Sequence, residues 1–209
     1  MKPFPKELFV TGTDTGIGKT VVSAMLTIGL KAGYWKPVQS GLEPETDTQF
    51  VRRATGLPDT HFYDEAYRLT EPMSPHASAA IDGVEIEMEH ITLPYYQQNH
   101  LIVEGAGGLL VPINGKQMII DLIRYLKLPV LLVARSSLGT LNHTFLSLEA
   151  LRRRNIPVWG VILSGEKHPS NEEAIRAYGK VKHLYHLPVL DEVQPEALQH
   201  RFQSLFNTK

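Results

Sequence analysis

Short apolar runs alternate with helical patterns along most of the chain. Strand-like runs lie at residues 8–11, 34–38, 101–104, 130–134, 158–163 and 188–190. Apolar residues recur with helical spacing at residues 19–32, 119–126, 141–154, 172–184 and 195–206. Runs of four to eight apolar residues are typical of strands buried on both faces, and their alternation with helices favours a doubly wound sheet. We therefore predict an α/β fold with a mainly parallel sheet and helices on both faces.

Residues 39–91 interrupt this alternation. They are rich in Pro, Thr, Asp and Glu, and they include the segment EPMSPHASAA at residues 71–80. A long excursion within a compact domain is more often a lid or binding loop than a plain surface insertion, which is the alternative. We expect residues 71–80 to form part of a cover over the site.

Length and charge narrow the class of protein. A chain of 209 residues fits a single domain spanning residues 1–209. Its net charge of -1 provides no basic field for nucleic acid or an anionic membrane, so we expect neither partner. Its apolar runs fall short of the roughly 18 residues of a membrane span. The sequence has no cysteine, which permits a reducing compartment, and we predict a cytoplasmic protein.

The stretch GTDTGIGKT at residues 12–20 is a variant of a phosphate-binding loop. In the standard pattern, four residues separate the first glycine from Gly-Lys-Ser/Thr, but here Thr13 takes that glycine's place and Gly12 comes one residue early. Such a loop offers backbone N–H groups to phosphates, while Lys19 supplies a charge and Thr20 a hydroxyl for Mg²⁺. The alternative, an ordinary glycine-rich turn, is disfavoured because a predicted strand precedes the loop and a predicted helix follows it. The loop therefore predicts a P-loop NTPase-type domain.

Two further clusters follow predicted strands. In LIVEGAGG, residues 101–108, an apolar run ends in Glu104, which is typical of the acid that faces Mg²⁺ in phosphate-loop enzymes. The alternative is that Glu104 only begins a polar turn. Asp47 is a candidate second carboxylate, because Mg²⁺ usually takes one or two.

Lys36 lies in YWKPVQSG, residues 34–41, near the end of the second predicted strand. From there its ammonium could reach the same pocket as Lys19, and two lysines at phosphates would stabilise charge during phosphoryl transfer. Spacing alone favours the alternative, a solvated surface lysine.

The ordered set of motifs resembles the dethiobiotin synthetase family, whose members close the ureido ring of dethiobiotin with ATP. The enlarged loop is similar to that family's own version, and KPVQSG, SPHASA, VEGAGGLLVPI and LGTLNHT match its other motifs in order, over residues 9–190. The resemblance implies a cyclo-ligase. It would use ATP and Mg²⁺ to join CO₂ to 7,8-diaminononanoate through a carbamate and a carbamic-phosphoric anhydride, releasing ADP and phosphate.

The resemblance also implies roles for individual residues. Lys36, Lys19 and Thr15 would be catalytic, Ser40 would hold the diamine end of the substrate, and Mg²⁺ would be held by Thr20, Asp47 and Glu104. The nucleotide would contact Gly16, Ile17, Gly18, Lys19, Thr20, Val21, Asp47, Glu104, Gly105, Ala106, Gly107, Ser164, Gly165, Pro188, Val189 and Leu190. Many members have an asparagine where this chain has Ser164, and a serine hydroxyl cannot make the paired contact of an amide with adenine. We therefore expect relaxed base selectivity.

The family is dimeric, so the resemblance implies a homodimer with the substrate site at the subunit interface. The substrate carboxylate would meet Gly139, Thr140, Leu141 and Asn142 of the other subunit. A helix N-terminus in this segment would suit an anion.

Two other classes of protein share some of these sequence motifs. Amidating ligases of corrin synthesis also resemble the glycine loop and VEGAGG, but they carry a glutaminase domain with a cysteine nucleophile, and this chain has no cysteine. Partitioning-type ATPase switches, which bind a protein partner, usually have a second lysine where this chain has Thr13. Dependence of ATP cleavage on the diamine would separate such a switch from a ligase.

Overall fold

The core of the fold is a seven-stranded parallel sheet with the order β4-β2-β6-β1-β7-β8-β9. The computed structural model describes residues 4–206, so residues 1–3 and 207–209 of the predicted domain lie outside the described part. The strands are β1 (Glu7–Gly12), β2 (Gly33–Trp35), β4 (Phe62–Tyr63), β6 (Leu101–Gly108), β7 (Val130–Arg135), β8 (Val158–Ser164) and β9 (Leu184–Leu187). The predicted parallel α/β architecture is confirmed.

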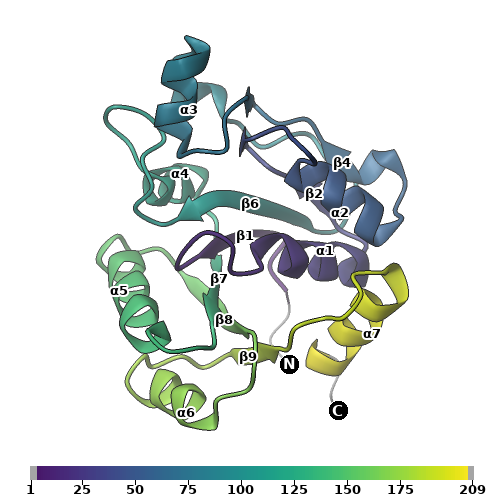
Figure 1. Cartoon of the computed structure of the whole chain (residues 1–209), viewed down its shortest axis with the longest axis vertical. Helices are drawn as coiled ribbons and strands as arrows, with labels where there is room; N and C mark the ends of the chain where they lie inside the picture. Colours follow the sequence, from purple (N-terminus) through teal and green to yellow (C-terminus); the bar gives the residue numbers. More distant parts are fainter. Residues whose placement is uncertain (1–3, 207–209) are drawn as a thin grey trace.

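Helices cover both faces of this sheet, as Figure 1 shows. The helices on one face are α1 (Lys19–Leu30), α2 (Asp47–Thr55) and α7 (Pro195–Phe206), and those on the other are α4 (Ile119–Leu126), α5 (Thr140–Arg153) and α6 (Pro169–Ala177). Among residues 4–206, no helix has both the length and the apolar character needed to cross a bilayer.

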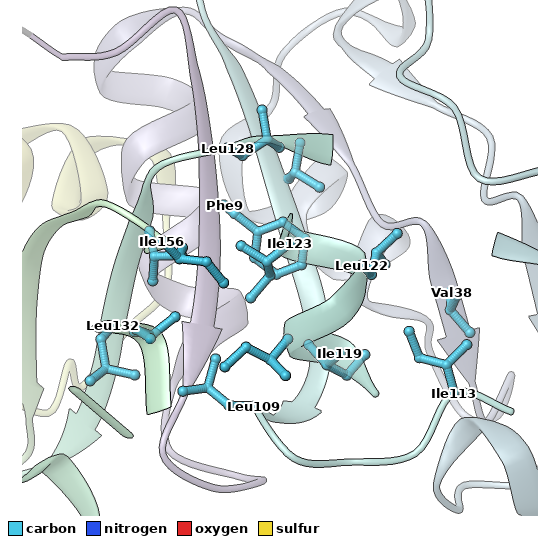
Figure 2. Close-up of a cluster of buried hydrophobic side chains, with 14 of the residues drawn as sticks. Phe9, Val38, Leu109, Ile113, Ile119, Leu122, Ile123, Leu128, Leu132 and Ile156 are labelled. Carbon is cyan, nitrogen blue, oxygen red and sulfur yellow. The ribbon is translucent and has the colours of Figure 1, made fainter. Parts of the chain in front are cut away.

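Alternating side chains of the strands divide the core into two layers. In β1, Phe9 belongs to the layer under α4 and α5, whereas Leu8 and Val10 belong to the layer under α1 and α7. This alternation follows from the two-residue period of a strand. Figure 2 shows the first layer, in which Ile119 and Ile123 of α4 lie with Phe9 in one cluster. Strand β1 is therefore buried on both sides, which fixes its carboxyl end in place.

The last helix supports the first from behind. Helix α7 packs on α1 at Gly29, where an added Cβ would lie 2.1 Å from the ring of Phe202. Phe202 also belongs to an aromatic group with Phe4, Trp159 and Phe206. Glycine at position 29 thus lets an aromatic ring sit directly on the helix that follows the phosphate loop.

The excursion between residues 39 and 91 is ordered around short elements. It contains α2, α3 (Pro75–Asp82), the short helices η1 (Asp59–His61) and η2 (Met88–His90), and a two-stranded parallel sheet of β3 (Val38–Ser40) and β5 (Tyr67–Leu69). Helix α2 starts with a capping box, in which Thr46 and Gln49 bond each other's backbone N–H groups. Helix α3 has Pro75 at its first turn. These elements place residues 39–47 and 72–75 beside the end of the main sheet.

The predicted strand at residues 34–38 is wrong in extent. Strand β2 ends at Trp35, and the chain then leaves the main sheet and resumes as β3 in the small one. Pro37 accounts for the break, because it has no N–H to donate to a sheet ladder.

The predicted helix at residues 172–184 and strand at residues 188–190 are also wrong in position. Helix α6 spans Pro169–Ala177, and the last strand is Leu184–Leu187. Val181, Leu184 and Leu187 are buried and spaced by three, which imitates a helical period, although Leu184 and Leu187 lie in a short edge strand. Pro188 then ends that strand.

Candidate active site

A cavity of about 650 Å³ opens where the carboxyl ends of β1, β3 and β6 meet. Ligands of open parallel sheets bind at this edge. The walls come from the loop after β1, the starts of α1 and α2, the segment before α3, and β6. The predicted site residues in the lining are Thr15, Gly16, Gly18, Lys19, Thr20, Val21, Lys36, Ser40, Asp47, Glu104, Ala106 and Gly107.

The loop between β1 and α1 presents Lys19 to this cavity. Gly18, the N-cap of α1, has a φ of 91°, and the first turn of α1 contains no acidic residue that would oppose an anion. The ammonium of Lys19 is buried and donates to the carbonyl of Asp14 at 2.8 Å. Burial lowers the pKa of Lys19 to about 8, against the opposing effect of Glu104. A phosphate would suit this position, because its negative charge would pair with the ammonium of Lys19.

Arg135 anchors the outer part of the loop. Its guanidinium, at the end of β7, pairs with the carboxylate of Asp14, which also accepts from the N–H of Thr15 at 2.8 Å. No sequence pattern indicates a role for Arg135, because nothing links positions 14 and 135 before the strand order is known. The pair ties the loop residue Thr15 to the neighbouring strand.

Three oxygen-bearing side chains converge beneath the loop. The hydroxyl oxygen of Thr20 lies 2.7 Å from Asp47 Oδ1 and 2.9 Å from Glu104 Oε1. A hydroxyl has one proton, so it donates to one carboxylate at a time. The three residues come from α1, the first position of α2, and β6, and the structure brings them together.

Lys36 bridges the same two carboxylates. Its ammonium lies 2.6 Å from Asp47 Oδ2 and 3.2 Å from Glu104 Oε1, and it is 4% exposed, so the reading of a solvated surface lysine is wrong. Burial acts to lower the pKa of Lys36, but Glu104 and Asp47 together outweigh it and raise that pKa above its ordinary value. Burial acts to raise the pKa of Asp47, and Lys36 reverses this, so the net shift is downward. Lys36 and Asp47 are therefore both charged.

Tyr34 holds the far side of Glu104. Its hydroxyl donates to Glu104 Oε2 at 3.0 Å, and the ring is fully buried. Burial, followed by the charge of Glu104, raises the pKa of Tyr34, so the phenol keeps its proton and remains a donor. The sequence pattern indicates only a strand residue at Tyr34, since aromatic residues are common in strands.

The donor set fits Mg²⁺, which prefers oxygen ligands and usually takes one or two carboxylates. Thr20, Asp47 and Glu104 provide one hydroxyl and two carboxylates within hydrogen-bonding distance of one another. Among residues 4–206, no group of three or more His, Cys, Asp or Glu side chains is placed to hold a metal, so this mixed set is the candidate.

Ser40 contributes to the cavity lining a polar group without a partner in the described part of the chain. The hydroxyl oxygen of Ser40 is buried, lines the cavity and has no hydrogen-bond partner among the described residues. Buried hydroxyls are normally bonded, so an unpaired one beside a cavity suits a ligand. Gln39, to which no sequence pattern assigned a role, lines the cavity next to Ser40 and is 5% exposed.

Some residues predicted to bind the nucleotide lie outside the cavity lining. Ser164 ends β8, and its hydroxyl oxygen would lie 2.9 Å from a Cβ added at Gly18, so β8 ends directly beside the loop. Ile17 is buried in the core, and the carbonyl of Gly105 accepts from Lys36 at 3.2 Å. The residues absent from the lining are Ile17, Gly105, Ser164, Gly165, Pro188, Val189 and Leu190.

The start of α5 does not reach the cavity of its own chain. Gly139 is the N-cap of α5, and Gly139, Thr140, Leu141 and Asn142 are all absent from the lining. A separate hollow of about 280 Å³ lies between the glycine loop and α5. Leu110 and Leu146 line this hollow and are each 56% exposed, and Leu138, which precedes α5 in the chain, is 98% exposed.

A family model and two related proteins match most of the chain. A family model described as an AAA domain matches residues 6–197. Proteins called ATP-dependent dethiobiotin synthetase BioD in Brucella ovis and Brucella canis are each 52% identical to the chain over 200 residues, covering 96% of it and 94% of the relative.

Solved structures with lower identity share the fold. A ParA family ATPase from Chlorobium tepidum has a TM-score of 0.53 at 15% identity, covering 96% of this chain and 90% of its own. The MinC:MinD cell division protein complex of Aquifex aeolicus has a TM-score of 0.54 at 12% identity, covering 94% and 90%. At such identities the likeness is evidence for the architecture alone.

Proposed function

The chain belongs to the family of ATP-dependent dethiobiotin synthetases, and from this premise we propose that its 650 Å³ cavity is where the ureido ring is closed. The enzyme is an ATP-dependent ligase that forms dethiobiotin and uses ATP with Mg²⁺. The observation that carries the proposed site is the convergence of Lys19 and Lys36 on the cluster of Thr20, Asp47 and Glu104.

The chemistry that we propose needs no protein nucleophile. CO₂ adds to one amine of 7,8-diaminononanoate and gives a carbamate, whose oxygen takes the γ-phosphoryl group of ATP and releases ADP. The second amine attacks the mixed anhydride, phosphate leaves, and a five-membered cyclic urea forms. Positioning and electrostatic stabilisation lower the activation barrier, and orientation alone lowers it by roughly 7 to 11 kcal/mol in favourable cases.

The two lysines hold the groups that carry negative charge in this reaction. Lys19 faces the phosphates from the loop, where it exchanges its contact with the Asp14 carbonyl for phosphate oxygens. Lys36, buried and charged, faces the carbamate. Ser40, whose hydroxyl has a free bonding capacity, and Thr15 hold the diamine. Water exclusion matters because water would hydrolyse the anhydride.

Thr20, Asp47 and Glu104 would hold Mg²⁺ in this proposal. The ion would neutralise phosphate charge as the phosphoryl group moves. Tyr34 and Lys36 keep Glu104 in place by bonding both of its oxygens.

We also propose that ATP extends from the loop toward the end of β8. Ser164 and Gly165 lie there, and backbone groups of Pro188, Val189 and Leu190 would make more of the contacts with the base than they do in family members that have the asparagine. This is consistent with relaxed selectivity for the base.

A homodimer would bring the start of α5 to the partner's cavity. The exposed leucines near the 280 Å³ hollow support an interface on this face, and Gly139, Thr140, Leu141 and Asn142 would offer the helix start to the substrate carboxylate. A cytoplasmic location remains a prediction, supported by the absence of cysteine from the sequence.

The test is to measure ADP release and dethiobiotin formation with and without the diamine and bicarbonate. We expect ADP release to require the diamine and to match product formation. Lys36→Met should lower product formation by about 100-fold or more, because a buried positive charge at the reacting group is lost.

Lys182→Met, which removes an exposed lysine far from the cavity lining, is the control and should retain wild-type rates. Full product formation by Lys36→Met would refute the proposed role. ADP release that is indifferent to the diamine would instead support a partitioning-type switch, for which the present support is the shared fold.

A further inference from the structure

The geometry points to Gln39 as a positioning residue that ties the substrate wall of the cavity to the metal ligand Asp47. This inference rests on the proposed function, because it takes Ser40 as a substrate contact and Asp47 as a ligand of Mg²⁺. Gln39 lies in β3, directly before Ser40, and its side chain is 5% exposed.

The amide of Gln39 bonds backbone groups at both ends of the segment that joins β3 to α2. Its Nε2 donates to the carbonyls of Ser40 at 3.2 Å and Gly41 at 2.9 Å. Its Oε1 accepts from the N–H of Asp47 at 3.1 Å. Only one orientation of the amide satisfies two carbonyl acceptors and one N–H donor, so the group is fixed.

The contact with Asp47 fixes the start of α2. The first N–H groups of a helix have no partner within the helix. The capping box satisfies the N–H groups of Thr46 and Gln49, and Gln39 satisfies that of Asp47 between them. The backbone of Asp47 is thereby fixed where its carboxylate meets Thr20 and Lys36.

The contacts at the other end set the direction of Ser40. The Gln39 amide holds the Ser40 carbonyl, which fixes the backbone that carries the serine hydroxyl, and this hydroxyl has no partner among the described residues. One amide thus fixes the two ends of the loop, the end that faces the diamine and the end that faces the metal. The structure therefore predicts that losing this amide weakens both ligands together.

The experiment replaces Gln39 by methionine, which has similar length and no hydrogen-bonding amide. The control is Thr48→Val, in the same helix, because Thr48 bonds Glu65 at 2.6 Å and does not line the cavity. Asp47→Asn is the reference for loss of the metal ligand. Mn²⁺, a hard ion that takes oxygen ligands as Mg²⁺ does, is the probe, and its binding is followed by electron paramagnetic resonance with a nonhydrolysable ATP analogue bound.

We expect Gln39→Met to weaken Mn²⁺ binding roughly tenfold, the usual effect of removing an outer partner of a metal ligand. Its KM for the diamine should rise by about threefold or more, while kcat at saturating metal and substrate stays within about twofold of wild type, since the reacting groups are intact. Thr48→Val should leave Mn²⁺ affinity and diamine KM unchanged, even if both variants lower the melting temperature equally.

Wild-type Mn²⁺ affinity in Gln39→Met, together with weakened binding in Asp47→Asn, would overturn this inference alone. The same losses in Thr48→Val would also overturn it, because they would assign the effect to general loosening of α2. Unchanged binding in Asp47→Asn would overturn the metal assignment, and the role of Gln39 with it.

Discussion

At the scale of the residue, Glu104 is held by two neighbours, because Tyr34 and Lys36 bond its two carboxylate oxygens. The glycine loop and Glu104 each come at the end of a predicted strand, so their convergence could be read from order along the chain, whereas Asp47 begins a helix that the sequence did not predict. Lys36 could not be decided by spacing, because its burial depends on the turn at Pro37 and on two carboxylates that lie far away in sequence. No sequence pattern indicated a role for Tyr34, because that role depends on its side chain facing Glu104 across neighbouring strands.

Gly18 provides a residue-scale prediction. With φ at 91° and Ser164 close by, Gly18→Ala should lower the free energy of unfolding by about 1–2 kcal/mol and weaken ADP binding by about tenfold or more. The reason is that the strained backbone would turn its N–H groups away from the phosphates. Urea unfolding and calorimetric titration with ADP measure the two effects.

Gly83→Ala is the matched control for that strain. Gly83 has φ at 66°, has nothing within 4 Å of an added Cβ, and ends α3 away from the loop. We expect a similar loss of stability with unchanged ADP affinity. If both variants bound ADP as the wild type does, the loop geometry would not be what binds the phosphates.

At the scale of the element, the main strands and helices were predictable because each buried strand leaves a continuous apolar run. The smaller elements were not, since α2 and α3 are short and much of their stability comes from caps and neighbours. The helix at residues 172–184 was misplaced because the three-residue spacing of apolar positions continues past Gly179 into an edge strand. The segment expected as a cover does contribute to the cavity wall through residues 72–75.

Met73 provides the prediction for this cover. Its side chain lines the cavity and is 51% exposed, so Met73→Ser should open the rim without unfolding the chain. Water would then reach the anhydride, and phosphate released per dethiobiotin formed should rise by roughly twofold. A phosphate assay run beside product quantification measures the ratio.

The control here is Ile81→Ser, an equally polar change at a position of α3 that is 61% exposed and outside the lining. Its ratio should remain that of the wild type. Tight coupling in Met73→Ser would show that residues 72–75 do not exclude water.

At the scale of the whole molecule, the cavity draws its lining from residues 15–111, while β7, β8 and the helices after them provide support. The second half of the chain instead presents the start of α5 and exposed leucines to the outside. One chain therefore builds the reacting centre but leaves the segment at residues 139–142 unused, and this favours the dimer proposed above.

Mixed dimers test that arrangement. Lys36→Met disables the cavity of its own subunit. Asn142→Asp should repel the carboxylate of a substrate that is bound in the partner's cavity. When the two inactive chains are co-expressed, we expect about one quarter of the wild-type product formation. Half of the dimers are mixed, and each mixed dimer has one intact site out of two. The measurement is product formation per mole of purified dimer.

Co-expression of Lys36→Met with Lys19→Met is the control, because both changes disable the cavity of their own subunit and no intact site can form. Recovery in this pair would invalidate the assay. No recovery in the first pair, although dimers form, would mean that each chain completes its own site.

The ring of Phe202 against Gly29 links the final helix to the first. Helix α7 follows all the strands of the sheet in chain order. A chain emerging from the ribosome therefore contains its phosphate loop long before α7 can pack on α1, the helix that follows the loop. We expect nascent chains to acquire tight nucleotide binding only after α7 has docked, so the growing polypeptide would not bind ATP prematurely.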